Sequence, residues 1–257
     1  MSDSSKTLVL GTPEELWQPA TRRGFLKLLG VGGTVVLLPS MFAACNSDKS
    51  TGIGSLGGGA TLDLSTDTGI LNYAYALEQL EAAFYVAAVG ASSFGSLSAA
   101  EQELVADVRN HEVIHREFFK AVLGSSAIGA LKTNSTTVTA ALSSRANMLA
   151  TARKLEDTGV AAYNGAGKYL KTADYLVVAG KIVSVEARHA AAFRDVLDSG
   201  TGRNFAGNDA VNAQGLDLKA EPSDVLAAVT ATNLVSTTIT VSSQPRTLAK
   251  TDNFLPS

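Results

Sequence analysis

Apolar residues recur every three to four positions over four long stretches of the chain, and this spacing predicts four amphipathic helices. The stretches cover residues 67–89, 98–124, 144–170 and 172–200. Their ends carry helix start and stop signals, because Ser98 opens a Ser-x-x-Glu capping box and glycines follow at 90, 124 and 200. Alternating patterns of useful strand length are missing from the sequence, so we expect an all-α fold.

The lengths of the connections indicate how the helices are joined. The first and third connections are short, which is typical of antiparallel neighbours, whereas residues 124–143 are rich in Ser, Thr, Gly and Ala. A linker of that length can cross the bundle. Residues 201–257 are rich in Gly, Asn, Asp and Ser and predict an irregular C-terminal extension with one short helix near 222–229. We therefore expect a four-helix bundle over residues 65–200, with a long crossover between its second and third helices.

Two of the predicted helices each contain a glutamate followed seven residues later by a tyrosine. Glu78 precedes Tyr85 in the first helix, and Glu156 precedes Tyr163 in the third. Seven residues span about two helical turns, so each glutamate and its tyrosine project from one face of the helix. The repeated spacing indicates that the first and third helices have matching roles.

The other two helices each contain a Glu-x-x-His pair. Glu112 and His115 lie in the second helix, and Glu186 and His189 lie in the fourth. Residues three apart are neighbours on a helix surface, so both side chains of a pair can approach one point. The chain therefore carries one pattern twice, a Glu-x6-Tyr helix followed by a Glu-x-x-His helix.

The glutamates of this pattern have apolar neighbours, so we expect their carboxylates to point into the bundle. Leu77 flanks Glu78, for example, and Val185 flanks Glu186. Buried carboxylates without partners are costly, and four of them together repel one another and take up protons unless cations neutralise them. Two divalent metal ions supply a charge of +4 against their charge of −4. The repeated pattern thus predicts a site for two metal ions.

These residues resemble the ferritin-like dinuclear carboxylate proteins, in which two helices give one Glu each and two give a Glu-x-x-His pair. Within that superfamily the chain is most similar to exported bacterial ferritin-like domain proteins. Four blocks carry the similarity in order, at residues 71–85, 111–115, 155–160 and 186–190. Each block alone is a weak signal, and their joint occurrence is a strong one.

The resemblance implies a role for each of the repeated residues. It implies terminal ligands at Glu78 and Glu156, bridging carboxylates at Glu112 and Glu186, and one nitrogen ligand per ion at His115 and His189. Tyr85 and Tyr163 are the candidate catalytic phenols beside the metals. The alternative is that both are ordinary aromatic residues at the edge of the core. Carboxylate and imidazole ligands accept iron and manganese alike, so the expected cofactors are two Fe or two Mn ions. The implied partners are these ions with oxygen or peroxide, and the implied activity is oxidation of Fe(II) or consumption of oxygen or peroxide.

Two other functions compete with this interpretation. His111, Glu112 and His115 also form the His-Glu-x-x-His motif of zinc metallopeptidases, although that function would leave the other repeated pairs as coincidences. In the preferred interpretation His111 is a surface group or contacts a ligand from outside. The third possibility is a non-catalytic ferritin-like scaffold or stress protein. Glu81 and Asp157 lie off the main angle of the pattern, and we expect them to be solvated or salt-bridged.

The N-terminal segment, residues 1–45, is expected to be an export signal. Residues 21–27 read Thr-Arg-Arg-Gly-Phe-Leu-Lys and precede an uncharged, mostly apolar run over 28–44, which is short for a membrane span. The segment resembles a twin-arginine signal, which implies a periplasmic or cell-envelope protein. Its end, Phe-Ala-Ala-Cys45, resembles a lipobox with Phe in place of the usual Leu. Cys45 is then either lipidated, anchoring the protein to a membrane through a flexible tether over 46–64, or removed with the signal.

Composition narrows the chemistry further. The net charge of −3 and the low content of charged residues, 18%, give no basic surface for nucleic acid, so none is expected as a partner. A single cysteine excludes an internal disulfide, a Cys-x-x-Cys redox motif and a rubredoxin-type iron site. Any metal ion must therefore be held by His, Asp and Glu. A homodimer is a further expectation for the assembly.

Overall fold

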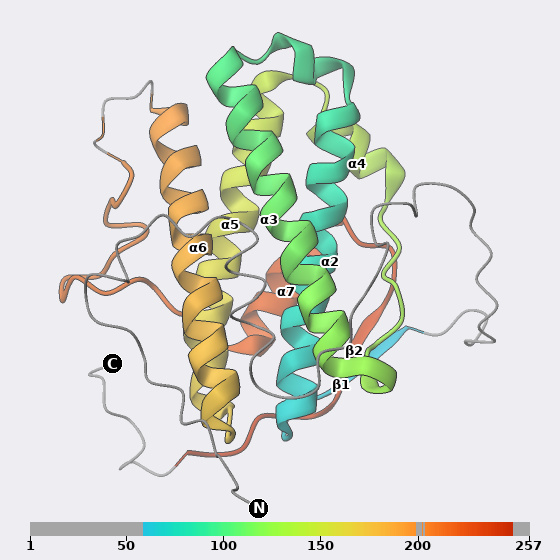
Figure 1. Cartoon of the computed structure of the whole chain (residues 1–257). Coiled ribbons are helices and arrows are strands. Elements are labelled where there is room, and N and C mark those ends of the chain that lie inside the picture. Colours follow the sequence, from blue (N-terminus) through green and yellow to red (C-terminus); the bar gives the residue numbers. More distant parts are fainter. Residues whose placement is uncertain (1–58, 199–201, 203, 249–257) are drawn as a thin grey trace, which may run out of the picture. The chain divides into compact units, whose positions relative to one another are not determined.

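A computed structural model describes residues 59–198, 202 and 204–248 of the chain. The twin-arginine motif, Cys45 and the expected tether as far as residue 58 lie outside the described residues. Four long helices run alongside one another (Figure 1): α2 (Asp67–Gly90), α3 (Ala99–Leu123), α5 (Arg145–Ala166) and α6 (Ala173–Leu197). Helix α2 packs chiefly against α3, and α5 against α6. The predicted all-α four-helix bundle is confirmed.

The helix boundaries follow local capping chemistry. The Ser98 hydroxyl accepts a hydrogen bond from the Glu101 N–H, and the Glu101 carboxylate accepts one from the Ser98 N–H, so the predicted capping box is formed at the start of α3. Helix α5 ends at Ala166, earlier than expected, because a 3₁₀ turn follows over Gly167–Tyr169. None of the described helices combines the length and the apolar character that a membrane crossing requires.

Three segments expected to be irregular contain regular structure. The expected flexible tether reaches residue 64, but Ala60–Asp63 forms strand β1, which pairs in parallel with β2 (Ile239–Ser243) from the C-terminal extension. The expectation of a flexible tether was wrong for these residues. Buried Ala60 and Leu62 alternate with exposed Thr61 and Asp63, as in a strand, but four residues are too few for the alternation to predict one from the sequence. The crossover contains a short helix, α4 (Ser135–Ala141), and α7 (Pro222–Thr232) extends the helix expected near 222–229.

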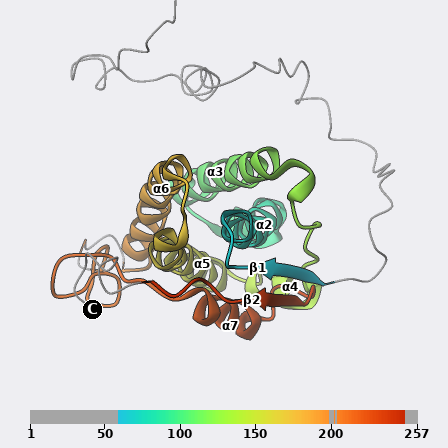
Figure 2. The same ribbon diagram turned by 90° about the horizontal axis from the view of Figure 1, so that it is seen from below.

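Helix α2 is enclosed on nearly all sides, and this decides the environment of the residues it carries. Seen along the bundle (Figure 2), α2 and α5 lie between the α3–α6 pair and a layer made of α7 and the two strands. The crossover runs along α2 and is held by two buried polar side chains. The Asn72 side-chain amide donates a hydrogen bond to the Ser126 carbonyl and accepts one from the Ile128 N–H. The Gln79 amide oxygen accepts one from the Leu131 N–H. These bonds satisfy backbone groups that would otherwise be buried without partners.

Candidate metal centre

Six residues of the repeated pattern meet in the interior of the bundle. The four glutamates have no exposed surface, and the two histidines are also buried. They come from all four long helices, with Glu78 on α2, Glu112 and His115 on α3, Glu156 on α5, and Glu186 and His189 on α6. The helical spacing therefore places each Glu-x-x-His pair on an inward face, as the sequence predicted.

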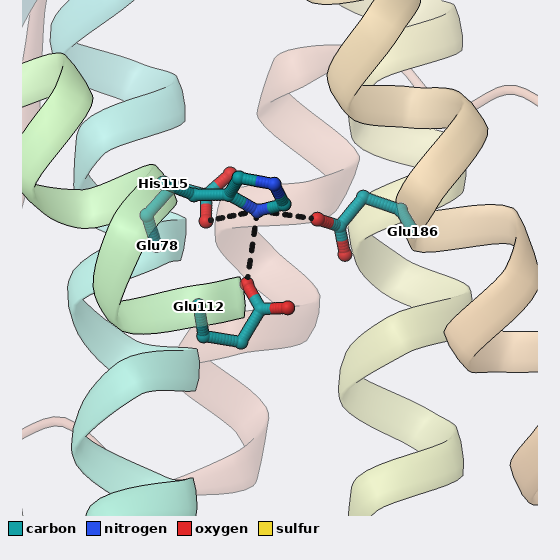
Figure 3. A group of neighbouring side chains, drawn as sticks. All are labelled: Glu78, Glu112, His115 and Glu186. Carbon is teal, nitrogen blue, oxygen red and sulfur yellow. Dashed lines mark ion pairs between the residues drawn. The ribbon is translucent and has the colours of Figure 1, made fainter. Parts of the chain in front are cut away.

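His115 lies among three of the carboxylates (Figure 3). Its Nδ1 atom is 3.4 Å from Glu78 Oε2, 3.4 Å from Glu112 Oε2 and 3.0 Å from Glu186 Oε1. These close contacts are not aligned as hydrogen bonds, because one ring nitrogen cannot point at three carboxylates at once. The arrangement gathers one nitrogen and three carboxylate groups around a common point.

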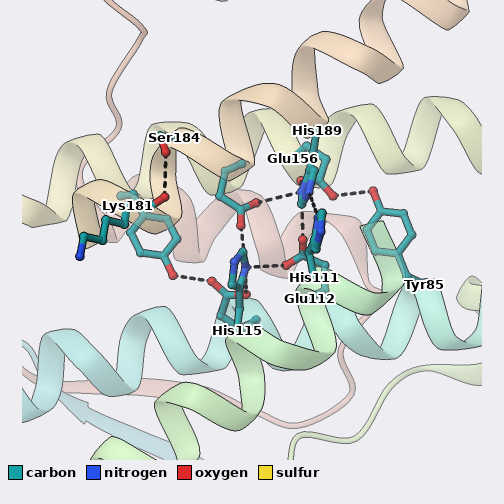
Figure 4. Close-up of polar contacts among 11 residues, drawn as sticks. Tyr85, His111, Glu112, His115, Glu156, Lys181, Ser184 and His189 are labelled. Carbon is teal, nitrogen blue, oxygen red and sulfur yellow. Dashed lines mark hydrogen bonds and ion pairs between the residues drawn. The ribbon is translucent and has the colours of Figure 1, made fainter. Parts of the chain in front are cut away.

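His189 occupies the equivalent position in the other half of the site (Figure 4). Its Nδ1 atom is 3.0 Å from Glu112 Oε1, 3.1 Å from Glu156 Oε2 and 4.0 Å from Glu186 Oε2. Each histidine thus contacts one carboxylate that belongs to its own half and the same two shared carboxylates. Glu112 and Glu186 are the shared pair, which is the arrangement that bridging ligands require.

Two overlapping ligand groups follow from these contacts. One contains Glu78 and His115, the other contains Glu156 and His189, and both include the shared pair. Within each group, one ligand atom per residue lies within 4.8 Å of all the others. Adjacent ligand atoms around an ion with bonds of about 2.1 Å at right angles lie about 3 Å apart, close to the contacts of each histidine. The residues fit metal ions held at both positions.

The two tyrosines of the pattern each bind the carboxylate of the opposite helix. The Tyr85 hydroxyl on α2 donates to Glu156 Oε1 on α5 at 2.5 Å, and the Tyr163 hydroxyl on α5 donates to Glu78 Oε1 on α2. Each carboxylate therefore has one oxygen held by a phenol and the other directed at a histidine. Burial and the neighbouring carboxylate raise the pKa of both phenols well above 10, so they remain protonated donors at neutral pH.

The polar atoms of the site are poorly satisfied by the protein alone. Glu78 Oε2, His115 Nδ1 and all four oxygens of Glu112 and Glu186 are buried and have no hydrogen-bond partner within the described part of the chain. Such atoms are rare in folded proteins and call for an explanation. Cations at the two positions would supply the missing interactions, so the donor chemistry and the unsatisfied atoms both fit a metal centre.

Burial and mutual repulsion dominate the electrostatics. Burial, together with the charge of Glu156, raises the pKa of Glu112 to about 7, and burial beside Glu112 raises the pKa of Glu186 well above its usual range. Burial alone would lower the pKa of His189, but its close contacts with the Glu112 and Glu156 carboxylates raise that pKa to about 10. The metal-free cluster therefore holds protons in place of cations.

The remaining expectations concern three residues near the site, Asp157, His111 and Glu81. Asp157 is salt-bridged as predicted, to Arg194 at 2.7 Å. His111 is exposed, and its Nδ1 lies 2.9 Å from His189 Nε2, so it contacts a site histidine from outside (Figure 4). The expectation for Glu81 was wrong: its side chain is buried, 3% exposed, because α2 is covered on the side that an ordinary bundle leaves to solvent. Only the tertiary packing reveals this buried carboxylate beside the cluster.

The fold and the site define a helical bundle with a buried carboxylate and histidine cluster compatible with metal binding. A family model described as "Ferritin-like domain" matches residues 66–199, more than half of the chain, and the chain therefore belongs to this family. The matched range includes all four long helices and every residue of the cluster. A search of curated proteins finds no match to the chain.

Proposed function

We propose that this protein holds two iron or manganese ions in the cluster and uses them to oxidise Fe(II) or to consume oxygen or peroxide. The observation that carries the proposal is the pair of overlapping ligand groups, each with its own histidine and terminal carboxylate and both sharing Glu112 and Glu186. Two ions of this kind would supply one-electron redox chemistry and two neighbouring positions for an oxygen-containing reactant. Six protein ligands of this type suit iron and manganese equally.

The protein residues would hold and orient this centre. Glu112 and Glu186 each direct oxygens at both histidines, so these two carboxylates would be the ligands common to both ions. The phenols of Tyr85 and Tyr163 fix the terminal carboxylates through one oxygen and leave the other free to bind. Such outer hydrogen bonds orient ligands and tune the charge they donate. We assign both tyrosines this orienting role.

His111 would connect the site to solvent. With its Nδ1 directed at a metal position, His189 would carry the proton on Nε2 and would donate a hydrogen bond to His111 Nδ1, 2.9 Å away. His111 is exposed, so this contact gives protons a short path between the cluster and water. In this role His111 is neither a zinc ligand nor part of either ligand group.

An apolar cavity of about 30 Å³ lies beside Tyr163, and its size and lining favour a small molecule as the reactant. Leu71, Ala74, Phe119 and Ala179 line it together with Tyr163, whose hydroxyl reaches the terminal carboxylate of the cluster. A cavity of this size has room for about two water-sized molecules, and its apolar lining favours a small uncharged molecule such as dioxygen.

Metal analysis and rapid kinetics test the proposal. Protein folded with Fe(II) or Mn(II) should contain about two ions per chain, and stopped-flow mixing of the Fe(II) form with oxygen should give an absorbance burst. Glu186→Ala and His189→Ala should abolish binding of the second ion, whereas Glu103→Ala, an exposed position on α3, should leave it intact. Two bound ions with no burst from either oxygen or peroxide would favour the non-catalytic scaffold.

The metallopeptidase makes the opposite predictions. It requires a single zinc ion bound through His111 and His115, so His111→Ala should abolish binding and His189→Ala should not. Membership of the ferritin-like family and the outward position of His111 both weigh against it. One zinc ion per chain with peptidase activity would overturn the dinuclear assignment.

We also propose that the protein is exported by the twin-arginine route and anchored through a lipidated Cys45. The support is the Thr-Arg-Arg-Gly-Phe-Leu-Lys sequence at 21–27 and the apolar run that ends at this cysteine. Replacing Arg22 and Arg23 by Lys should retain the precursor in the cytoplasm in a cell-fractionation assay. Mass spectrometry of the mature N-terminus distinguishes an acylated Cys45 from a cleaved signal without lipid.

A further inference from the structure

The apolar cavity beside Tyr163 adjoins one of the two ligand groups, the one that contains Glu78 and His115. We call this part of the site the cavity half, and the part with the other terminal glutamate and histidine the opposite half. Ala74, one turn before Glu78 on α2, and Phe119, one turn after His115 on α3, both line the cavity. The terminal ligands of the opposite half have no lining residue within one helical turn of them. The cavity therefore breaks the twofold repeat of the site.

The internal repeat shows which side chains leave this space unfilled. Counted from the repeated glutamates, Ala162 on α5 is equivalent to Phe84 on α2, and Ala179 on α6 is equivalent to Val105 on α3. Both alanines line the cavity, whereas Phe84 and Val105 are buried in the core cluster of the opposite half. Methyl groups in the cavity half thus replace a benzyl and an isopropyl group, and in a close-packed interior such a difference leaves a void.

Aromatic rings close the opposite half. Tyr85 stacks on Phe193 with ring centroids 5.9 Å apart and planes inclined by 18°, and Phe84 meets Tyr85 edge-on at 5.2 Å. The equivalent pair in the cavity half, Tyr163 and Phe119, is looser, with centroids 6.5 Å apart and planes inclined by 35°. Side chains therefore fill the space beside one tyrosine of the pattern and leave space beside the other.

The lining of the cavity continues to the surface between α3 and α6. Val122 lines the cavity and is 39% exposed, and the lining residues Phe118, Tyr175 and Val178 are half-buried, whereas Tyr163 is 8% exposed. Helix α3 packs on α6 much less than on α2, so few contacts hold this seam closed. Side-chain rotations at such a surface take picoseconds to nanoseconds and can admit a small molecule. The apolar walls favour an uncharged one over an ion, which would lose its hydration there.

We propose that dioxygen enters between α3 and α6 and reaches the ligand cluster through this cavity, at the cavity half. This inference rests on the proposed dinuclear function and adds to it a route and a point of arrival. The repeat is also broken at His111, because the equivalent position on α6 is Val185. His111 contacts the histidine of the opposite half, so proton exchange and the arrival of the apolar reactant belong to different halves.

Xenon binding tests the cavity without any metal. Apolar cavities bind xenon, so diffraction from xenon-pressurised crystals of the metal-free protein should show a xenon atom beside Tyr163. Ala162→Phe, which copies the opposite half, should abolish this site, and Ala179→Val should lower its occupancy. Ala121→Val makes the second change at an exposed position of α3 and should leave the site intact. Wild-type protein without xenon at this position would overturn the proposal.

Stopped-flow oxidation of the Fe(II)-loaded protein tests whether the cavity is the route. Ala162→Phe should lower the second-order rate constant for oxygen by about tenfold and Ala179→Val by about threefold, with two ions per chain retained, whereas Ala121→Val should change neither. The smaller Ala179→Val change decides the matter if the Phe side chain overpacks the core. Wild-type oxygen rates in a variant that has lost the xenon site would overturn the route and leave the dinuclear function standing. Wild-type protein that binds fewer than two ions would refute the dinuclear function itself, and the route with it.

Discussion

The metal-free protein should lose stability as the pH rises from 5 to 8, the reverse of the usual behaviour of a protein stabilised by surface carboxylates. Glu112 illustrates the sign. Its carboxyl group has a pKa of about 7 in the folded state against 4.5 in the unfolded chain, because burial and nearby Glu156 disfavour its charge. The folded state therefore binds more protons between these values, and stability falls as the pH passes through them.

The size of the effect follows from the shift. A pKa raised from 4.5 to about 7 corresponds to about 3 kcal/mol of stability, present below pH 4.5 and lost by pH 7. His189 acts in the same direction over a higher range. Its pKa of about 10 exceeds the ordinary 6.5, because its close contacts with two carboxylates outweigh its burial. Its contribution to stability is therefore present below pH 6.5 and lost as the pH rises towards 10.

Urea unfolding of the metal-free protein at half-unit steps from pH 5 to 8, followed by circular dichroism at 222 nm, measures this slope. The scan starts at pH 5 because the Glu101 carboxylate, whose pKa its hydrogen bonds to Arg145 hold at about 2, contributes only to losses at lower pH. Glu112→Gln should flatten the curve between pH 5 and 7. Stability of the metal-free protein that rises or stays constant across this range would refute the electrostatic argument.

Metal loading should remove the same pH dependence. Ligands must lose their protons to bind metal ions, so binding should release protons and hold the carboxylates charged. Calorimetric titration in two buffers of different ionisation enthalpy counts the protons released. Stability of the loaded protein should then be constant or rise from pH 5 to 8. Metal binding without proton release would contradict the protonated state of the metal-free cluster.

Three further predictions concern the fold. Gly165→Ala should destabilise the protein by several kcal/mol, because the new Cβ would lie 1.7 Å from the Ala220 carbonyl oxygen. Gly180→Ala, at an exposed helical position with open space around it, should increase the free energy of unfolding by about 0.5–1 kcal/mol. Thermal unfolding compares the two variants. Tyr73→Phe should be neutral or stabilising in urea unfolding, because the buried hydroxyl has no hydrogen-bond partner in the described part of the chain. Ser98→Ala should cost about 1 kcal/mol through loss of the capping box, and an unchanged midpoint would show that the cap contributes nothing.

Much of the fold and the site was accessible from the sequence because the signals are local. Apolar spacing predicted all four long helices, and the Ser98 capping box predicted where α3 begins. Residues three or seven apart on one helix must share a face whatever surrounds them, so Glu112 with His115 and Glu78 with Tyr85 could be paired before any tertiary contact was known. The internal repeat then indicated which helices contribute equivalent ligands.

Contacts between distant segments could not be derived in this way. The local sequence around Tyr85 does not indicate that its hydroxyl binds Glu156 on another helix. The parallel pairing of β1 with β2 likewise joins segments about 180 residues apart, as in the contact of Thr61 with Thr240. Asn72 and Gln79 are polar residues of a kind that usually lies at the surface. Only the structure shows that the crossover packs over them and buries them.

The sequence by itself determined the helices, the six candidate ligands and their division into two repeated halves, because each depends on spacing within one helix. The tertiary structure alone decided that Glu81 is buried, that Gly159 faces it, and that each tyrosine crosses to the opposite carboxylate. Burial depends on what covers a helix, and the cover of α2 on its outer side comes from the crossover and strand β1. A pattern of 3.6 residues per turn describes one helix and carries no information about the segments that pack on its other side.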